Sequence, residues 1–145
     1  MTQHRTMPAP AAALGYAGLI PFAGTALGVA IGVGADAMTG AFTAYAATIL
    51  AFLGGIQWGL AFHFGAERRL ERVAVGVMPS LVAWICLLLP TPGAIAILAV
   101  GFAAIHGYDE LRNIPQLPIW FGRLRRHLTS GVLLCHAGIL AAITL

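Results

Sequence analysis

Long apolar stretches, separated by short polar or proline-containing segments, dominate the chain. Five such stretches can be drawn, and they cover residues 14–34, 42–64, 73–89, 93–107 and 128–145. A helix needs about 20 predominantly apolar residues to cross a bilayer, and about 17 is the usual lower limit. The first two stretches meet this length, the third and fifth are close to the limit, and the fourth borrows residues at its end. The pattern therefore predicts five membrane-spanning helices.

Prolines divide and bend these stretches. Pro-Thr-Pro-Gly at residues 90–93 separates the third stretch from the fourth. Such a sequence stops one helix and starts the next, so we expect a tight helical hairpin there. Pro21 and Pro79 lie inside the first and third stretches and predict a kink in each. Ser80, next to Pro79, is a polar side chain that can hydrogen-bond the backbone groups freed by the kink.

The composition agrees with a membrane protein. Of 145 residues, 59% are hydrophobic and only 9% are charged, whereas soluble domains carry about 25% charged residues. The chain cannot cover a water-facing surface, and its length allows one polytopic membrane domain over residues 1–145. We therefore expect an all-α bundle of five transmembrane helices. The net charge of +3 does not indicate a nucleic-acid partner, because no basic domain is present to dock one.

Arginine distribution predicts the orientation of the bundle. If five helices span the membrane, the N-terminal tail and the loops 65–72 and 108–127 lie on one side. Asp36, the proline turn and the C-terminus lie on the other side, which carries no basic residue. Basic residues near helix ends stay in the cytoplasm, so the N-terminus is expected inside and the C-terminus in the periplasm. The first side holds every basic residue of the chain: Arg5, Arg68, Arg69, Arg72, Arg112, Arg123, Arg125 and Arg126.

The segment before the fifth stretch has an amphipathic pattern. Pro115 and Pro118 interrupt the chain, and residues 119–124 then place apolar side chains among arginines. This pattern is typical of a short helix that lies on the membrane surface, where each arginine contributes about 1 kcal/mol to the attraction of anionic lipid. We expect this surface to contact lipid headgroups or, alternatively, an acidic partner protein. Its candidate contact residues are Trp120, Arg123, Arg125 and Arg126.

Small residues recur at helical spacing in the first two stretches. Gly24, Gly28 and Gly32 are four residues apart, as are Gly55 and Gly59. Such spacing places the glycines on one face of a helix, where a second backbone can approach closely. These glycines are candidate helix-packing residues, either within the chain or between copies in a homo-oligomer.

Gln57 is a polar side chain inside an apolar stretch. A buried amide is unfavourable in hydrocarbon unless it is hydrogen-bonded, so we expect Gln57 to bond to another helix. The candidate partners are Ser80, Thr25 and His136. A contact with a substrate or a quinone is the alternative.

Histidines are the candidate chemical groups. Ionisable side chains inside a membrane commonly mark functional sites, and His63 and His136 are candidates for binding haem b or a quinone. Their spacing matches no recognised cofactor signature. We therefore predict no metal site and no bound cofactor, with haem b or a quinone as the alternative. No catalytic constellation is visible, so the chain is not expected to be an enzyme.

Four segments together carry a family resemblance. They are residues 14–22 (LGYAGLIPF), 52–61 (FLGGIQWGLA), 77–84 (VMPSLVAW) and 117–125 (LPIWFGRLR). In this order they resemble an uncharacterised bacterial inner-membrane family related to mitochondrial transmembrane protein 69, over roughly residues 12–140. The resemblance implies a small multi-pass protein of a bacterial inner membrane. It implies no activity, cofactor or catalytic residue.

Three classes of function remain open at this point. The first, which we favour, is a non-catalytic accessory or assembly subunit of an energy-converting membrane complex. The second is a small transporter or channel, which would need an oligomer and an aqueous path along Gln57, Ser80 and His136. The third is a redox protein that binds haem or a quinone through His63 or His136.

Overall fold

Six α-helices make up most of the computed structural model, which describes residues 7–64 and 66–144. No strand occurs in these two ranges, so the all-α prediction is confirmed. Short 3₁₀ turns at Ala66–Arg68 and Ile114–Gln116 and a π-helical turn at Asp109–Asn113 join some of the helices. The helices are α1 (Ala9–Ala17), α2 (Ile20–Ala30), α3 (Ala35–His63), α4 (Arg69–Cys86), α5 (Thr91–Tyr108) and α6 (Ile119–Thr144).

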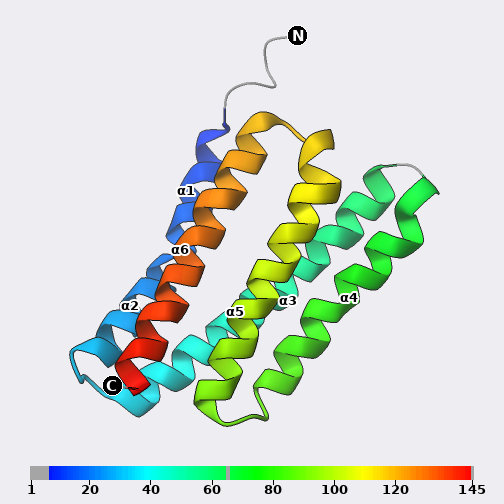
Figure 1. The fold of residues 1–145 in the computed structure, drawn as a ribbon. Helices are drawn as coiled ribbons and strands as arrows, with labels where there is room; N and C mark the ends of the chain where they lie inside the picture. The colour runs from blue at the N-terminus through cyan, green and yellow to red at the C-terminus, as the bar shows by residue number, and fades with distance from the viewer. Residues whose placement is uncertain (1–6, 65, 145) are drawn as a thin grey trace.

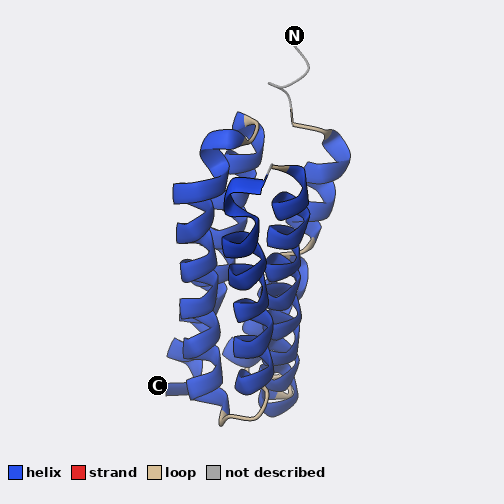
Figure 2. Ribbon diagram, turned by 90° about the vertical axis from the view of Figure 1, so that its right-hand side faces the viewer, coloured by secondary structure: helices blue, strands red, loops and turns tan. Residues whose placement is uncertain are grey.

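The helices run up and down in an elongated bundle (Figures 1 and 2). Helix α3 packs against α2, α4 and α5, while α6 packs against α1, α2 and α5. The α3–α4 turn, the α5–α6 turn and the start of α1 lie at the same end of the bundle (Figure 1). We call it the arginine-rich end, because all arginines of the described residues belong to these two turns and the helix turns that flank them.

Four segments are long and apolar enough to cross a membrane: α1 with α2, α3, α5 with the turns that follow it, and α6. Helix α4 is not among them, because Arg69, Glu71 and Arg72 in its first turn add charge to a helix of 18 residues. The predicted count of five spans is therefore not confirmed. Helix α4 nevertheless packs along α3 over most of its length (Figure 1).

The first apolar stretch is broken where Pro21 predicts a kink. Helix α1 ends at Ala17, and α2 begins at Ile20 with Pro21 in its first turn. The Tyr45 hydroxyl of α3 donates a hydrogen bond to the Gly18 carbonyl oxygen at 3.0 Å. The stretch also stops before residue 34, because Gly32 and Gly34 adopt positive φ angles of 75° and 55°, which glycine tolerates without steric cost.

The separate surface helix expected before the last span is not confirmed. Residues 119–127 form the first turns of α6, which continues without a break to Thr144. The reason lies in the pattern of burial: Gly122, Arg125, Thr129 and Val132 are buried at steps of three and four residues. One face of a single helix is therefore buried on both sides of the expected boundary at residue 128.

A glycine pair brings α3 and α4 into close contact. A Cβ atom at Gly54 would collide with the Gly76 carbonyl oxygen, and one at Gly76 would lie 2.8 Å from the Gly54 carbonyl oxygen. Only residues without side chains allow two helix backbones to approach in this way. Above this contact, at the arginine-rich end, the two helices enclose polar groups.

Candidate functional site: a buried polar cluster at the arginine-rich end

Five polar or charged side chains gather inside the arginine-rich end, and we call them the buried polar cluster. Each exposes 7% or less of its surface. Arg and Asp side chains are almost never fully buried unless they are paired, and Asn and Gln are mostly exposed. The cluster consists of Gln57 from α3, Arg72 from α4, Asp109 and Asn113 from the π-helical turn, and Arg125 from α6.

Asp109 is the centre of the cluster. Its Oδ1 atom accepts hydrogen bonds from Gln57 Nε2 at 2.7 Å and from Asn113 Nδ2 at 2.8 Å. Its Oδ2 atom accepts two more, from Arg125 Nε at 3.0 Å and from Arg125 Nη2. Both Arg125 donors thus converge on one oxygen of the carboxylate in a charge-assisted pair. Both carboxylate oxygens are thus occupied by protein donors.

Asn113 links this pair to α4. Its Nδ2 also donates to Gln57 Oε1 at 2.8 Å, and its Oδ1 accepts from Arg72 Nε at 3.3 Å. The Arg72 guanidinium in addition lies over the ring of Phe64, 5.0 Å from the ring centroid. The cluster therefore ties together three helices and the turn after α5.

Local geometry explains how these residues meet. The π-helical turn places Asp109 and Asn113, four residues apart, on the same side of the chain, where Asn113 Nδ2 bonds Asp109 Oδ1. Arg72 shares the buried face of α4 with Gly76, Pro79 and Ala83, at steps of four, three and four. Single π turns inside helices are rare and occur often at functional sites.

A more exposed layer of ion pairs surrounds the cluster. Glu110 accepts hydrogen bonds from Arg126 Nε at 2.7 Å and Arg126 Nη2 at 3.0 Å. Glu71 accepts one from the Tyr108 hydroxyl at 3.1 Å and lies 3.7 Å from Arg112.

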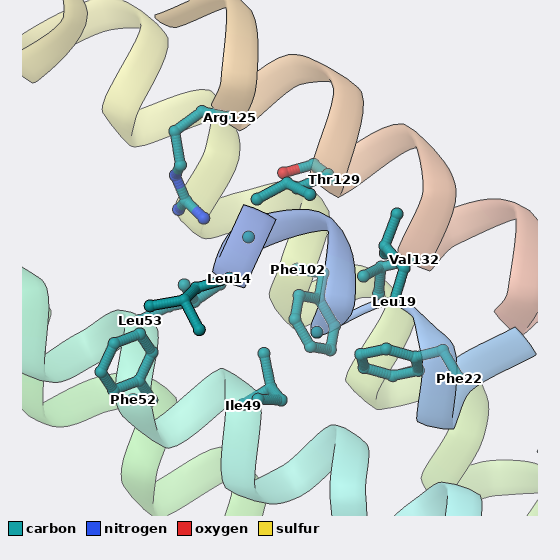
Figure 3. A pocket seen from close by; sticks show the side chains of 13 residues that line it. Leu14, Leu19, Phe22, Ile49, Phe52, Leu53, Phe102, Arg125, Thr129 and Val132 are labelled. Atoms are coloured by element: carbon teal, nitrogen blue, oxygen red, sulfur yellow. The ribbon is translucent and has the colours of Figure 1, made fainter. Parts of the chain in front are cut away.

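An apolar pocket of about 180 Å³ lies next to the cluster, between α1, α2, α3, α5 and α6 (Figure 3). Its walls are mainly Leu, Ile, Val and Phe side chains, including Leu14, Phe22 and Phe52. Arg125 and Thr129 of α6 are its polar wall residues. Figure 3 shows the Arg125 guanidinium at one side of the pocket. The pocket is suited to an apolar group with a small polar end.

The prediction that Gln57 bonds to another part of the bundle agrees with the structure, but the candidate partners were wrong. Ser80 is exposed, and the Thr25 hydroxyl donates to the Pro21 carbonyl oxygen at 2.6 Å. His136 Nδ1 lies 2.8 Å from the Val132 carbonyl oxygen. The partners of Gln57 are acidic and amide groups that were assigned to a loop.

The two candidate cofactor ligands are not brought together. His63 is exposed at the last residue of α3, whereas His136 is buried in the middle of α6 among Phe22, Phe42 and Phe102. They line no common pocket among those found in the described residues. Within the same residues, no group of three or more His, Cys, Asp or Glu side chains is placed to hold a metal ion.

Most of the predicted packing glycines contact no other helix. A Cβ atom at Gly24, Gly55 or Gly59 would meet no atom within 4 Å, whereas one at Gly28 would lie 2.9 Å from Met38 Cγ. Gly32 lies beyond the end of α2. Close packing inside the chain uses Gly54 and Gly76 instead.

The predicted lipid-contacting surface is only partly exposed. Arg123 and Arg126 are exposed and Trp120 is half-buried, but Arg125 is 7% exposed and belongs to the cluster. Assigning Arg125 to the surface was therefore wrong. The three-to-four-residue spacing of Arg125 with Thr129, Val132 and His136 is the signal that could have placed it inside.

Sequence reasoning also missed Arg72, Asp109 and Asn113 as cluster members. Arg72 falls in the expected loop 65–72, and Asp109 and Asn113 fall in the expected loop 108–127. The burial of Arg72 is visible in its spacing with Gly76 and Pro79. No comparable signal exists for Asp109 and Asn113, because a π-helical turn has no recognised sequence pattern.

Comparison with known proteins gives a family match over most of the chain. Residues 7–141 match the family described as "Protein of unknown function (DUF3429)". The chain is 36% identical over 129 residues to "Transmembrane protein 69" of Xenopus tropicalis, which covers 84% of this chain and 50% of that protein. The protein of the same name from Mus musculus is 36% identical over 125 residues, covering 81% and 50%. The chain spans about half the length of these relatives. No solved structure matches the chain significantly.

Proposed function

The chain belongs to the DUF3429 family of proteins of unknown function and is a multi-pass membrane protein, and from this premise we propose that it is a non-catalytic accessory or assembly subunit of a larger membrane complex. In this proposal, five helices cross a bacterial inner membrane with the arginine-rich end in the cytoplasm. The arginine distribution supports that orientation. The mitochondrial relatives implied by the sequence resemblance favour an energy-converting complex as the partner.

One face of α3 is the observation that carries this proposal. Gly55 and Gly59 lie four residues apart on it, and neither is covered by another part of the described chain. Phe52 and Phe62, on the same face, are 64% and 66% exposed. At a position that faces lipid, glycine has no advantage over alanine or leucine. At a helix–helix contact, a glycine pair lets a second helix approach the backbone closely. The α3 face therefore suits a helix of another membrane protein.

The buried polar cluster supports a structural rather than a catalytic role for the arginine-rich end. The Asp109 carboxylate already accepts four hydrogen bonds from protein donors. A general base or nucleophile needs a free lone pair within reach of a substrate. Asp109 is instead arranged to hold α3, the π-helical turn and α6 in register.

Substitution of the α3 glycines tests the proposal. We expect the full chain, extracted in mild detergent, to copurify with a stoichiometric membrane-protein partner identified by mass spectrometry. Gly55→Leu and Gly59→Leu should remove that partner and leave the chain folded, because leucine favours a helix over glycine by roughly 1 kcal/mol. Gly138→Leu is the matched control, since a Cβ atom at Gly138 of α6 also meets nothing within 4 Å. A monomer without partners would contradict the proposal.

The apolar pocket favours a second candidate function, the binding of a quinone or a similar amphiphile. Its walls are apolar, while Arg125 and Thr129 supply hydrogen-bonding groups at one side (Figure 3). A small number of polar groups in an apolar pocket is the usual composition of a ligand site. Extraction of the purified protein with organic solvent and chromatography of the extract tests this candidate. A quinone at stoichiometric amount, lost in Val132→Trp, supports it, and an extract without quinone contradicts it.

A further inference from the structure

A second pocket lies at the arginine-rich end, beside the cluster. Its volume is about 500 Å³, and most of its lining residues are charged or polar. It is formed by the end of α3, the 3₁₀ turn Ala66–Arg68, the first turn of α4 and the 3₁₀ turn Ile114–Gln116 before α6. The lining residues are Phe64, Ala66, Glu67, Arg68, Arg72 and Gln116.

Arg72 is an uncompensated cation at the base of this pocket. It is 2% exposed, yet no carboxylate of the described residues lies within 4 Å of its guanidinium. Its hydrogen bond in the described structure runs from Nε to Asn113, so that the terminal nitrogens have no acceptor there. A buried charge without a counter-ion is costly. Within the described residues, Arg72 therefore has donors left for a ligand in the pocket it lines.

The charge of the cluster leads to the same conclusion. Arg72 and Arg125 bring two positive charges into the cluster, and Asp109 brings one negative charge that Arg125 already occupies. The exposed Arg68 adds a further cation at the pocket wall, and Glu67 offsets only one of these charges. An anion in the pocket would balance the excess positive charge and accept hydrogen bonds from the terminal N–H groups of Arg72.

The chemistry of the donors identifies the type of anion. Guanidinium groups present several N–H donors in a plane, which matches the oxygens of a phosphate group. Leu70, in the first turn of α4 beside the pocket, is 82% exposed. Exposed apolar side chains beside arginines are typical of a membrane–water boundary, where phospholipid headgroups lie.

We propose that the pocket formed by Arg72 and Arg68 binds a phosphate group, supplied by an anionic phospholipid headgroup or by free phosphate. This site differs from the surface around Trp120 and Arg123. It depends on one buried and one exposed arginine at the start of α4. It also does not depend on the α3 face or on a partner protein.

Binding to the purified full chain in neutral detergent tests the proposal. One arm titrates phosphatidylglycerol against monogalactosyldiacylglycerol, a lipid without phosphate; the other titrates inorganic phosphate against chloride at equal ionic strength. Thermal unfolding and native mass spectrometry report affinity. Binding in the lipid arm alone identifies a headgroup site, binding in both arms identifies a phosphate site open to either source, and each result supports the proposal.

Matched arginine variants separate a specific site from general attraction. Arg68→Gln should weaken phosphate binding about tenfold, the loss expected for one charge-assisted hydrogen bond. Arg123→Gln, an exposed arginine at the same end but outside the pocket, should change affinity less than about twofold. Arg72→Lys keeps the charge and loses the planar fork, so it should weaken binding at least about tenfold if the variant folds. Absence of binding in both arms, or equal losses in Arg68→Gln and Arg123→Gln, would overturn the proposal.

Discussion

Two regions of the bundle enclose polar side chains among apolar helices, and they differ in how these side chains are paired. In the buried polar cluster, Asp109 accepts four hydrogen bonds from three residues. Halfway along α6, His136 is equally buried, but its Nε2 atom has no partner within the described structure. Its ring is surrounded by Phe22, Phe42 and Phe102, with ring centroids 5.9, 4.8 and 5.4 Å away.

The difference separates two ways of burying a polar group. In the cluster, charge and hydrogen-bonding capacity are shared across several helices, so removal of one member leaves the others unpaired in a medium of low dielectric constant. Among the residues that the structure describes, His136 bonds only to the Val132 carbonyl oxygen of its own helix. It contributes mainly a flat ring to aromatic packing. The cluster should therefore be strongly coupled and His136 nearly independent.

The largest effect is expected from Asp109→Asn. The substitution removes the negative charge and leaves Arg125 buried without a counter-ion. Loss of one partner from a buried ion pair costs about 3–5 kcal/mol, and we expect a loss of that size in the free energy of unfolding. Denaturation by sodium dodecyl sulfate in mixed micelles measures it. A loss below about 1 kcal/mol would show that the carboxylate does not hold the cluster together.

A smaller loss is expected from Gln57→Leu. The change deprives Asp109 of one donor and Asn113 of one acceptor, and an unsatisfied buried polar group costs about 1–3 kcal/mol. The same denaturation measurement applies. Ser80→Ala is the control, because Ser80 is exposed on α4 and should leave stability unchanged. Equal stability of the two variants would place Gln57 outside the network.

His136→Leu should change stability by less than about 1.5 kcal/mol, since a core replacement of roughly similar size costs little when no hydrogen-bond network is lost. Far-ultraviolet circular dichroism during thermal unfolding would detect a larger change. A loss of about 3 kcal/mol or more would mean that Nε2 has a partner, such as a bound ligand, and would remove the contrast between the two regions.

The smallest effect is expected from Glu110→Gln, next to Asp109 in the sequence. Glu110 pairs with Arg126 at the exposed rim, where solvent and salt screen the interaction. We expect no measurable change in thermal stability in high salt. A loss comparable to that of Asp109→Asn would show that burial is not what distinguishes the two carboxylates.

The bundle itself could be predicted well because apolar stretches of spanning length leave few alternatives to helices. Pro21 also marked the break between α1 and α2. The cluster could not be predicted in the same way, because Asp109 and Asn113 depend on a π-helical turn. The assignment of Arg125 to a lipid surface followed its basic neighbours rather than its spacing with Thr129 and Val132. Glycine spacing, finally, identifies the helix face on which the glycines lie, but not the helix that packs against that face.

A double-mutant cycle between Asp109 and Arg125 tests the central claim most directly. The cycle compares the free energies of unfolding of the wild type, Asp109→Asn, Arg125→Gln and the double variant in mixed micelles. Direct partners in one network show coupling energies of about 0.5–3 kcal/mol, and we expect a value in the upper half of that range. Additive losses, with a coupling energy below about 0.3 kcal/mol, would contradict a buried ion pair that joins α6 to the turn after α5.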